Sequence, residues 1–157
     1  MEFVSPTKGP MSFDRMFREI VAFVQEAPQD PYTLIIGSDS QAKEQLTSFV
    51  TAVVIHRVGK GARYFYQRRS HRPMRSLRQR ILFETSLSLG LAGSMAERLS
   101  HNGHAQLNIE IHLDIGQQGD TRALIREIVG MVTGSGFDAK IKPDSYGASK
   151  VADKYTK

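Results

Sequence analysis

The stretch LIIGSDSQA (residues 34–42) begins as an apolar run and then changes abruptly to Gly37 and Asp39. Its first three residues are typical of a buried β-strand, an element in which aspartate is disfavoured. A carboxylate at the end of a buried apolar run costs free energy unless another group compensates its charge. Asp39 therefore indicates a functional site, and the elements around it indicate which fold presents that site.

Hydrophobic periodicity on either side of this stretch predicts alternating strands and helices. A helix is expected from a cap at Ser12 to about residue 27, and the prolines of PQDPY (28–32) end it. The other expected strands and helices are strands 34–36, 49–57, 63–68, 107–113 and 139–142, and helices 76–99, 121–134 and a last one from about residue 148. The order β-β-β-α-β-α-β-α after the first helix predicts an α/β fold, with a five-stranded mixed sheet flanked by helices.

The chain of 157 residues is 40% apolar and fits one domain with a core that needs no disulfides. Residues 1–11 contain two prolines and a glycine and are expected to form a flexible tail, which leaves 12–157 as the domain. The absence of Cys excludes a disulfide framework and Cys-ligated zinc. The first residues do not have a signal-peptide pattern, and no apolar run approaches the ~20 residues of a membrane span. A cytoplasmic protein without a membrane partner is expected.

The net charge of +5 is concentrated in one part of the chain. Residues 57–80 contain nine Lys or Arg residues and no acid, with the aromatic run Tyr64–Tyr66 among them. Such a stretch is typical of a surface that binds the phosphates of nucleic acid, although a solvated basic face would have the same composition. If the surface binds nucleic acid, Arg68 and Arg69 at its centre are the expected contacts.

Four acids stand out from those on exposed helix faces. Asp39 ends a strand, Glu84 lies in the most apolar helix (ILFETSLSLGLA, 81–92), Asp114 follows strand 107–113, and Asp153 lies in the last helix. If strands 34–36 and 107–113 are parallel neighbours, Asp39 and Asp114 emerge at the sheet end where ligands bind in open α/β folds.

Clustered carboxylates raise each other's pKa unless a cation lies among them, and oxygen ligands suit Mg²⁺ or Mn²⁺. Two such ions can hold the attacking and leaving oxygens of a phosphoryl transfer. Taken singly, each of these acids also has a simpler explanation, such as a turn cap, an ion pair with Arg or an exposed helix position.

Several neighbouring polar residues are candidates for weaker roles. Ser40 and Gln41 flank Asp39, and Lys150 lies one helical turn before Asp153, so all three are expected to contact substrate or its phosphate. His112 alternates with apolar residues and is expected to be a structural histidine within the sheet. The chain has neither a G-x-S-x-G elbow nor a phosphate-binding P-loop.

Three motifs, GSDSQ (37–41), HLDIGQQGDTR (112–122) and ASKVADKYT (148–156), resemble the bacterial YkuK-type family of the ribonuclease H-like superfamily. The resemblance covers roughly residues 33–157. It implies three antiparallel strands before a helix, followed by alternating strands and helices. It also implies a two-metal site, for Mg²⁺ or Mn²⁺, whose ligands and catalytic residues are Asp39, Glu84, Asp114 and Asp153.

One departure from the superfamily lies before the last helix. Ribonuclease H enzymes often carry a histidine there that assists product release, whereas KPDSYGAS (142–149) has none. It has Asp144, which competes with Asp153 for the fourth acidic position.

These observations favour a divalent-metal-dependent nuclease acting on RNA, DNA or a hybrid. The alternative is a nucleic-acid-binding module of the same fold with weak or no turnover. The apolar stripe of helix 12–27 is expected to pack in the core or to form a homo-oligomer contact.

Overall fold

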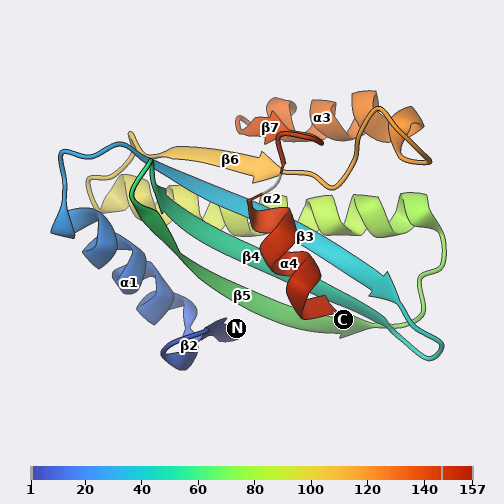
Figure 1. The fold of residues 1–157 in the computed structure, drawn as a ribbon, viewed down its shortest axis with the longest axis horizontal. Coiled ribbons are helices and arrows are strands. Elements are labelled where there is room, and N and C mark those ends of the chain that lie inside the picture. Colours follow the sequence, from blue (N-terminus) through green and yellow to red (C-terminus); the bar gives the residue numbers. More distant parts are fainter. Residues whose placement is uncertain (1, 146, 157) are drawn as a thin grey trace.

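A computed structural model describes residues 2–145 and 147–156 of the chain, with the backbone alone described at 149 and 150. It is a mixed α/β fold in which helices cover both faces of a seven-stranded sheet of order β2-β1-β5-β4-β3-β6-β7 (Figure 1). The strands are β1 Glu2–Ser5, β2 Gly9–Ser12, β3 Tyr32–Ala42, β4 Thr47–Arg57, β5 Gly61–His71, β6 Asn108–His112 and β7 Asp138–Lys140. The helices are α1 Phe13–Glu26, α2 Leu77–His101, the 3₁₀ turn η1 Arg122–Leu124, α3 Ile125–Gly134 and α4 Ala148–Thr156. None of the described helices is long and apolar enough to cross a membrane.

Strand β3 lies between an antiparallel and a parallel neighbour. It pairs with β4 along its full length, and it pairs in parallel with β6 from Thr33–Asn108 to Gly37–His112. The parallel pairing on which the expected placement of Asp39 and Asp114 depended is therefore present. Strand β3 is longer than predicted because its polar residues after Gly37 continue the ladder with β4. It consequently extends beyond the end of β6.

The N-terminal residues differ from the flexible tail predicted for 1–11. Residues 2–12 form a β-hairpin, and β1 pairs with β5 through Val4 and Tyr66. The side chains of Phe3 and Met11 are 0% and 5% exposed and belong to the main core, which holds the hairpin on the sheet. This hairpin accounts for the two strands beyond the five predicted. Strands of four residues carry too little periodicity to be recognised in the sequence.

Helices pack on both faces of the sheet, α1 and α2 on one face and α4 on the other (Figure 1). Leu34 and Ile36 face the first layer, whereas Ile35 packs with Ala148 and Ala152 of α4. Because both faces of β3 are covered, its apolar run is buried without interruption.

Helix α1 begins where predicted, since the Ser12 hydroxyl accepts a hydrogen bond from the Arg15 amide at 3.1 Å. Its apolar stripe is packed inside the molecule, where the buried residues are Met16, Phe17, Ile20 and Phe23. The stripe therefore packs in the core of its own chain, which was one of the two roles expected for it. An oligomer contact through the same helix stays a prediction.

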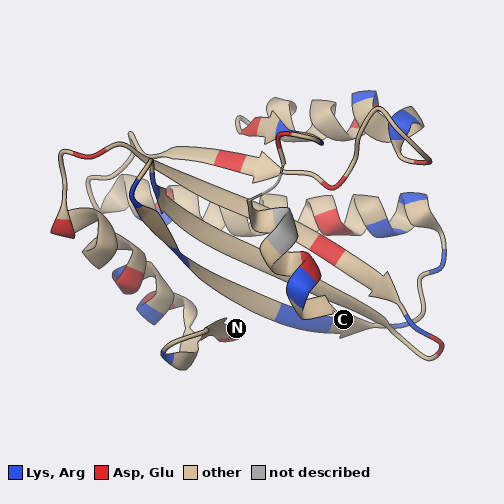
Figure 2. Ribbon diagram, in the orientation of Figure 1, with Lys and Arg blue, Asp and Glu red and all other residues tan. Residues whose placement is uncertain are grey.

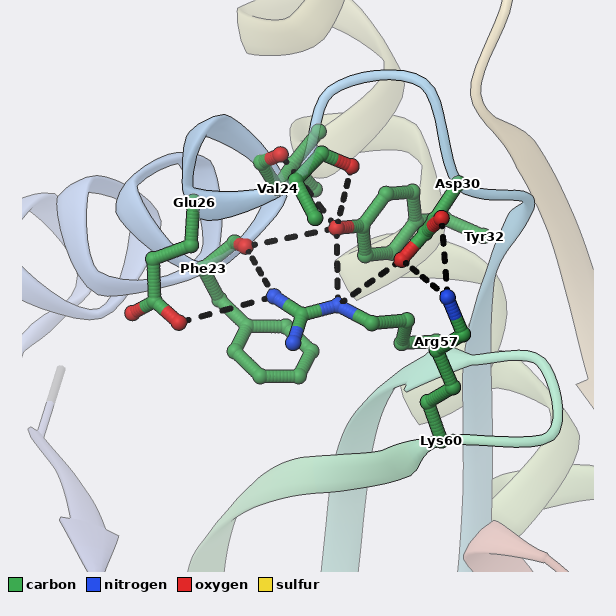
Figure 3. A network of polar contacts seen from close by, with 8 residues as sticks. Phe23, Val24, Glu26, Asp30, Tyr32, Arg57 and Lys60 are labelled. Atoms are coloured by element: carbon green, nitrogen blue, oxygen red, sulfur yellow. Dashed lines mark hydrogen bonds and ion pairs between the residues drawn. The ribbon is translucent and has the colours of Figure 1, made fainter.

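The C-terminal end of α1 is fastened to the sheet by Arg57, the first residue of the basic stretch (Figure 3). Its Nη2 donates to the Phe23 carbonyl at 2.8 Å, and its Nε donates to the Tyr32 hydroxyl at 2.9 Å. Lys60 Nζ contacts Asp30 Oδ1 at 3.3 Å beside them. Part of the basic stretch therefore makes structural contacts at the end of β4 where the turn to β5 begins.

Candidate carboxylate site

Asp39 and Asp114 lie at equivalent positions just beyond the last pair of two neighbouring parallel strands. Gly37 and His112 form the last pair between β3 and β6, and each acid lies two residues beyond its strand's member of that pair. Asp39 is 7% exposed, whereas the side chain of Asp114 is 38% exposed. The two carboxylates thus lie at the carboxyl end of the parallel strands, where ligands bind in open α/β sheets.

Helix α2 places Glu84 beside this edge through two contacts with β3. The Ser38 hydroxyl hydrogen-bonds the Ser88 hydroxyl at 2.8 Å, and the Ser40 hydroxyl donates to Glu84 Oε2. Residues two apart on a strand and four apart on a helix are separated by similar distances, about 6–7 Å. The two bonds therefore align α2 against β3 and hold the carboxylate of Glu84, which is 8% exposed, at the level of Ser40.

Helix α4 brings the fourth acid to the opposite face of the sheet. A hydrogen bond with Asp153 and the charge of that residue both contribute to raising the pKa of Asp39, so the two carboxyls are neighbours. Asp144 instead lines a cavity of ≈ 450 Å³ on this face together with Glu110 and His112. Of the two acids that competed for the fourth position in the sequence, Asp153 is the one that lies beside Asp39.

The pKa values of the two buried acids are strongly perturbed. Burial, reinforced by the charge of Asp114, raises the pKa of Asp39 to about 7. Burial also raises the pKa of Glu84 to about 8; the Ser40 hydrogen bond opposes this shift, while Asp39 and Asp114 add to it. Carboxyls from β3, α2, α4 and the segment after β6 therefore form one electrostatically coupled group.

Two cationic side chains reach this group, and the sequence prediction included neither as a site residue. Lys142 Nζ lies 2.9 Å from Asp114 Oδ1, and the charge of Arg80 opposes part of the rise that burial causes in the pKa of Glu84. Lys142 belongs to the loop KPDSYGAS. Its position at the start of the segment that leads to the last helix is a sequence signal that could have pointed to it.

The donor set of the four acids is purely oxygen, which suits Mg²⁺ or Mn²⁺. Burial and the charges of neighbouring acids raise the pKa values of Asp39 and Glu84, and a divalent ion would offset this cost, so the donor chemistry fits divalent ions. The ligand geometry is not closed, because within 2–145 and 147–156 no three His, Asp or Glu side chains are arranged to hold a metal ion. The contacts of Ser40 and Lys142 with two of the acids are consistent with this open arrangement.

The predicted substrate contacts next to the acids fall into different environments. Ser40 is engaged with Glu84, so its contact in the structure is with a site acid. Gln41 is exposed at the free edge of β3. Lys150 lies in α4, but its side chain is outside the described part of the chain.

The two predicted arginine contacts point to opposite faces of β5. Arg68 Nη2 donates to the Tyr155 carbonyl at 2.9 Å, so its guanidinium binds the C-terminal end of α4. Arg69 is exposed and lines a cavity of ≈ 310 Å³ together with Phe13 and Thr51. Figure 2 shows basic positions at this end of β5 and along the segment that leads to α2, beside the acidic positions on β3 and α2.

His112 has the structural role predicted for it. The Gly147 amide donates to its Nδ1 at 3.3 Å, so Nε2 carries the proton and donates to Glu110 Oε1 at 3.0 Å. Burial lowers the pKa of this histidine, although Glu110 opposes the shift. The neutral ring thereby ties β6 to the loop that begins α4.

The family model of the ribonuclease H-like proteins matches residues 15–157, nearly the whole domain. The chain belongs to the ribonuclease H-like family. It is also 39% identical to the uncharacterized protein YkuK of Bacillus subtilis (strain 168), in an alignment that covers 99% of this chain and 96% of that protein. This ribonuclease H-like chain is therefore of the YkuK type. No solved structure matches it at a significant level.

Proposed function

We propose that this chain is a divalent-metal-dependent nuclease that hydrolyses phosphodiester bonds in nucleic acid. The observation that supports this most is the gathering of acids from separate elements around two buried carboxyls: burial, reinforced by the charges of neighbouring acids, raises the pKa of both Asp39 and Glu84. Four carboxyls from separate elements are costly to bring together for structure alone. A pair of divalent ions would compensate their charges.

Each acid would contribute differently to the site. Asp39 and Asp114, at the ends of the parallel strands, would supply most of the negative charge that binds the metal ions. Glu84, held by Ser40, and Asp153, held on α4, would complete the ligand set. Two bound ions would supply stabilisation of the attacking and leaving oxygens in an in-line displacement at phosphorus. Exposed arginines at the end of β5 would hold the phosphate backbone.

The test is cleavage of end-labelled RNA, DNA and hybrid substrates with Mg²⁺ or Mn²⁺. Asp39→Asn and Asp114→Asn should each reduce the rate by at least about 100-fold, because each removes a ligand charge. The matched control is Asp144→Asn, which removes an acid from the neighbouring cavity and should retain activity. Unchanged cleavage by both site variants would refute the assignment.

A nucleic-acid-binding module is the second candidate. It is favoured by the open geometry of the acids in the described residues and by the lysine that contacts Asp114. Binding with a steep salt dependence and no cleavage with either metal would support it over the nuclease.

A further inference from the structure

We infer that Lys142 is an exchangeable cation of the carboxylate site: its ammonium binds Asp114 until a divalent ion takes that carboxylate, and it then contacts the substrate's phosphate. The inference rests on the proposed function, because it assumes that Asp114 binds metal. Its direct support is the 2.9 Å contact between Lys142 Nζ and Asp114 Oδ1.

The backbone fixes where this lysine side chain begins. The Leu113 amide donates to the Lys140 carbonyl at 2.8 Å, and the Lys142 amide donates to the Ile115 carbonyl at 2.8 Å. These two bonds connect the segment around Asp114 to the segment that contains Lys142. At Gly116, a Cβ atom would lie 3.0 Å from the Lys142 Cβ, so the glycine allows the two segments to approach closely. Lys142 is thus held beside Asp114 by the fold and not by the ion pair alone.

The ion pair itself is suited to exchange. The side chains of Lys142 and Asp114 are 58% and 38% exposed, and ion pairs in such solvated positions are weak. A divalent ion carries twice the charge of an ammonium and accepts several oxygen ligands at once. It would therefore displace Lys142 from Asp114.

The displaced ammonium stays near the site because its backbone does not need to move. A lysine on a flexible stem binds phosphate as a compact point charge. The substrate brings a phosphodiester anion into the site. The released ammonium would then lie next to a group of opposite charge that it can bind. Lys142 would then be a catalytic residue that contacts the substrate.

Calorimetric titration with Mn²⁺ distinguishes direct competition between Lys142 and the metal from the general repulsion of Mn²⁺ by a nearby positive charge. Lys142→Met should bind Mn²⁺ roughly fivefold more tightly than wild type, the upper range for loss of an exposed ion pair. The matched control is Lys140→Met, which removes the same charge from the end of β7 and should change the affinity less than about twofold. In an Asp114→Asn background, the effect of Lys142→Met should disappear.

A second titration uses a short single-stranded oligonucleotide with Ca²⁺ in place of Mn²⁺. Lys142→Met should bind it about two- to fivefold more weakly than Lys140→Met does, through loss of one phosphate contact. Equal oligonucleotide affinities would overturn the phosphate contact.

Equal Mn²⁺ affinities of the two lysine variants, with a wild type that binds Mn²⁺, would overturn the exchange while leaving the proposed nuclease intact. Failure of wild type to bind Mn²⁺ at all would overturn the metal-dependent function and this inference together.

Discussion

Asp39 and Glu84 are acids whose neighbourhood favours the protonated form. Their pKa values, about 7 and about 8, lie above the ordinary 3.8 and 4.5, so the folded protein binds more protons than the unfolded chain between these limits. The free energy of unfolding must then fall as the pH rises from about 4 to 8, by an amount on the order of 10 kcal/mol for the two acids together. The stabilisation is fully present at low pH and is lost as the pH passes the folded pKa values.

Urea denaturation in EDTA at pH 5, 6, 7 and 8 measures this loss. We expect Asp39→Asn to flatten the profile, because the amide cannot ionise, and Asp144→Asn to leave it unchanged. Added Mg²⁺ or Mn²⁺ should restore stability at pH 8 if the acids bind metal. A wild-type profile that rises with pH in EDTA would contradict the burial of these groups.

Arg57 illustrates a basic residue with a purely structural set of contacts. Replacing it with Met removes hydrogen bonds to Phe23 and Tyr32 and leaves the end of α1 without its donor. We expect the Tm to fall by a few degrees while affinity for nucleic acid stays unchanged. Differential scanning calorimetry and a fluorescence binding assay would measure the two effects. A loss of binding without a loss of stability would show that this residue belongs to the ligand surface.

At the scale of elements, the position of α2 depends on its two contacts with β3. Ser88→Ala removes one of them and should lower the free energy of unfolding by about 1 kcal/mol. The matched control is Ser86→Ala on the exposed side of the same helix, whose hydroxyl bonds only the Leu82 carbonyl and which should be nearly neutral. A double-mutant cycle with Ser38→Ala measures the coupling between the two hydroxyls. Additive effects would show that this bond does not align the helix.

Helix α4 is short and depends on aromatic packing to stay on the sheet. The rings of Tyr66 and Tyr155 stack with centroids 3.8 Å apart, and Arg68 binds the Tyr155 carbonyl. Tyr155→Ala should make the amides of 148–156 exchange hydrogen at least about tenfold faster, because an isolated helix of this length is marginal. The matched control is Tyr64→Phe, which loses only the 2.9 Å hydrogen bond between the hydroxyls of Tyr64 and Tyr155. Equal exchange in the two variants would show that stacking does not hold α4.

At the scale of the whole molecule, the basic stretch divides between two ends of the sheet. Arg57 and Lys60 are engaged at one end, whereas Arg69 and Arg72 are exposed and form no ion pair within the described part of the chain. We expect Arg69→Ala with Arg72→Ala to weaken binding of nucleic acid and to reduce the salt slope by about two.

The matched double variant at the opposite end of the sheet is Lys60→Ala with Arg63→Ala, which should leave the slope unchanged. Binding measured by fluorescence anisotropy at several salt concentrations gives both slopes. Equal salt slopes for the two double variants would contradict a phosphate-binding surface beside the acids.

Much of the architecture was predictable because the spacing of apolar residues along the chain indicates which face of each strand or helix is buried. The apolar run 34–36 and the alternation over 107–113 indicated two buried strands, whereas their parallel pairing was only a condition of the prediction until the structure showed it. The hairpin of residues 2–12 was missed because its two strands are too short to show periodicity. Arg68 was predicted to contact substrate, but in the structure it binds the end of α4, a partner that lies far away in the sequence.

The sequence by itself determined the order of the main helices and strands after residue 12, the acids that follow the apolar strand runs and the polar change after Gly37, because each depends on neighbouring residues. Only the tertiary structure decided that Asp153, and not Asp144, lies beside Asp39, and that Lys142 binds Asp114. These choices depend on how α4 and the loop before it pack against the sheet. Packing brings together side chains that no local pattern relates, so no spacing in the sequence could have assigned them.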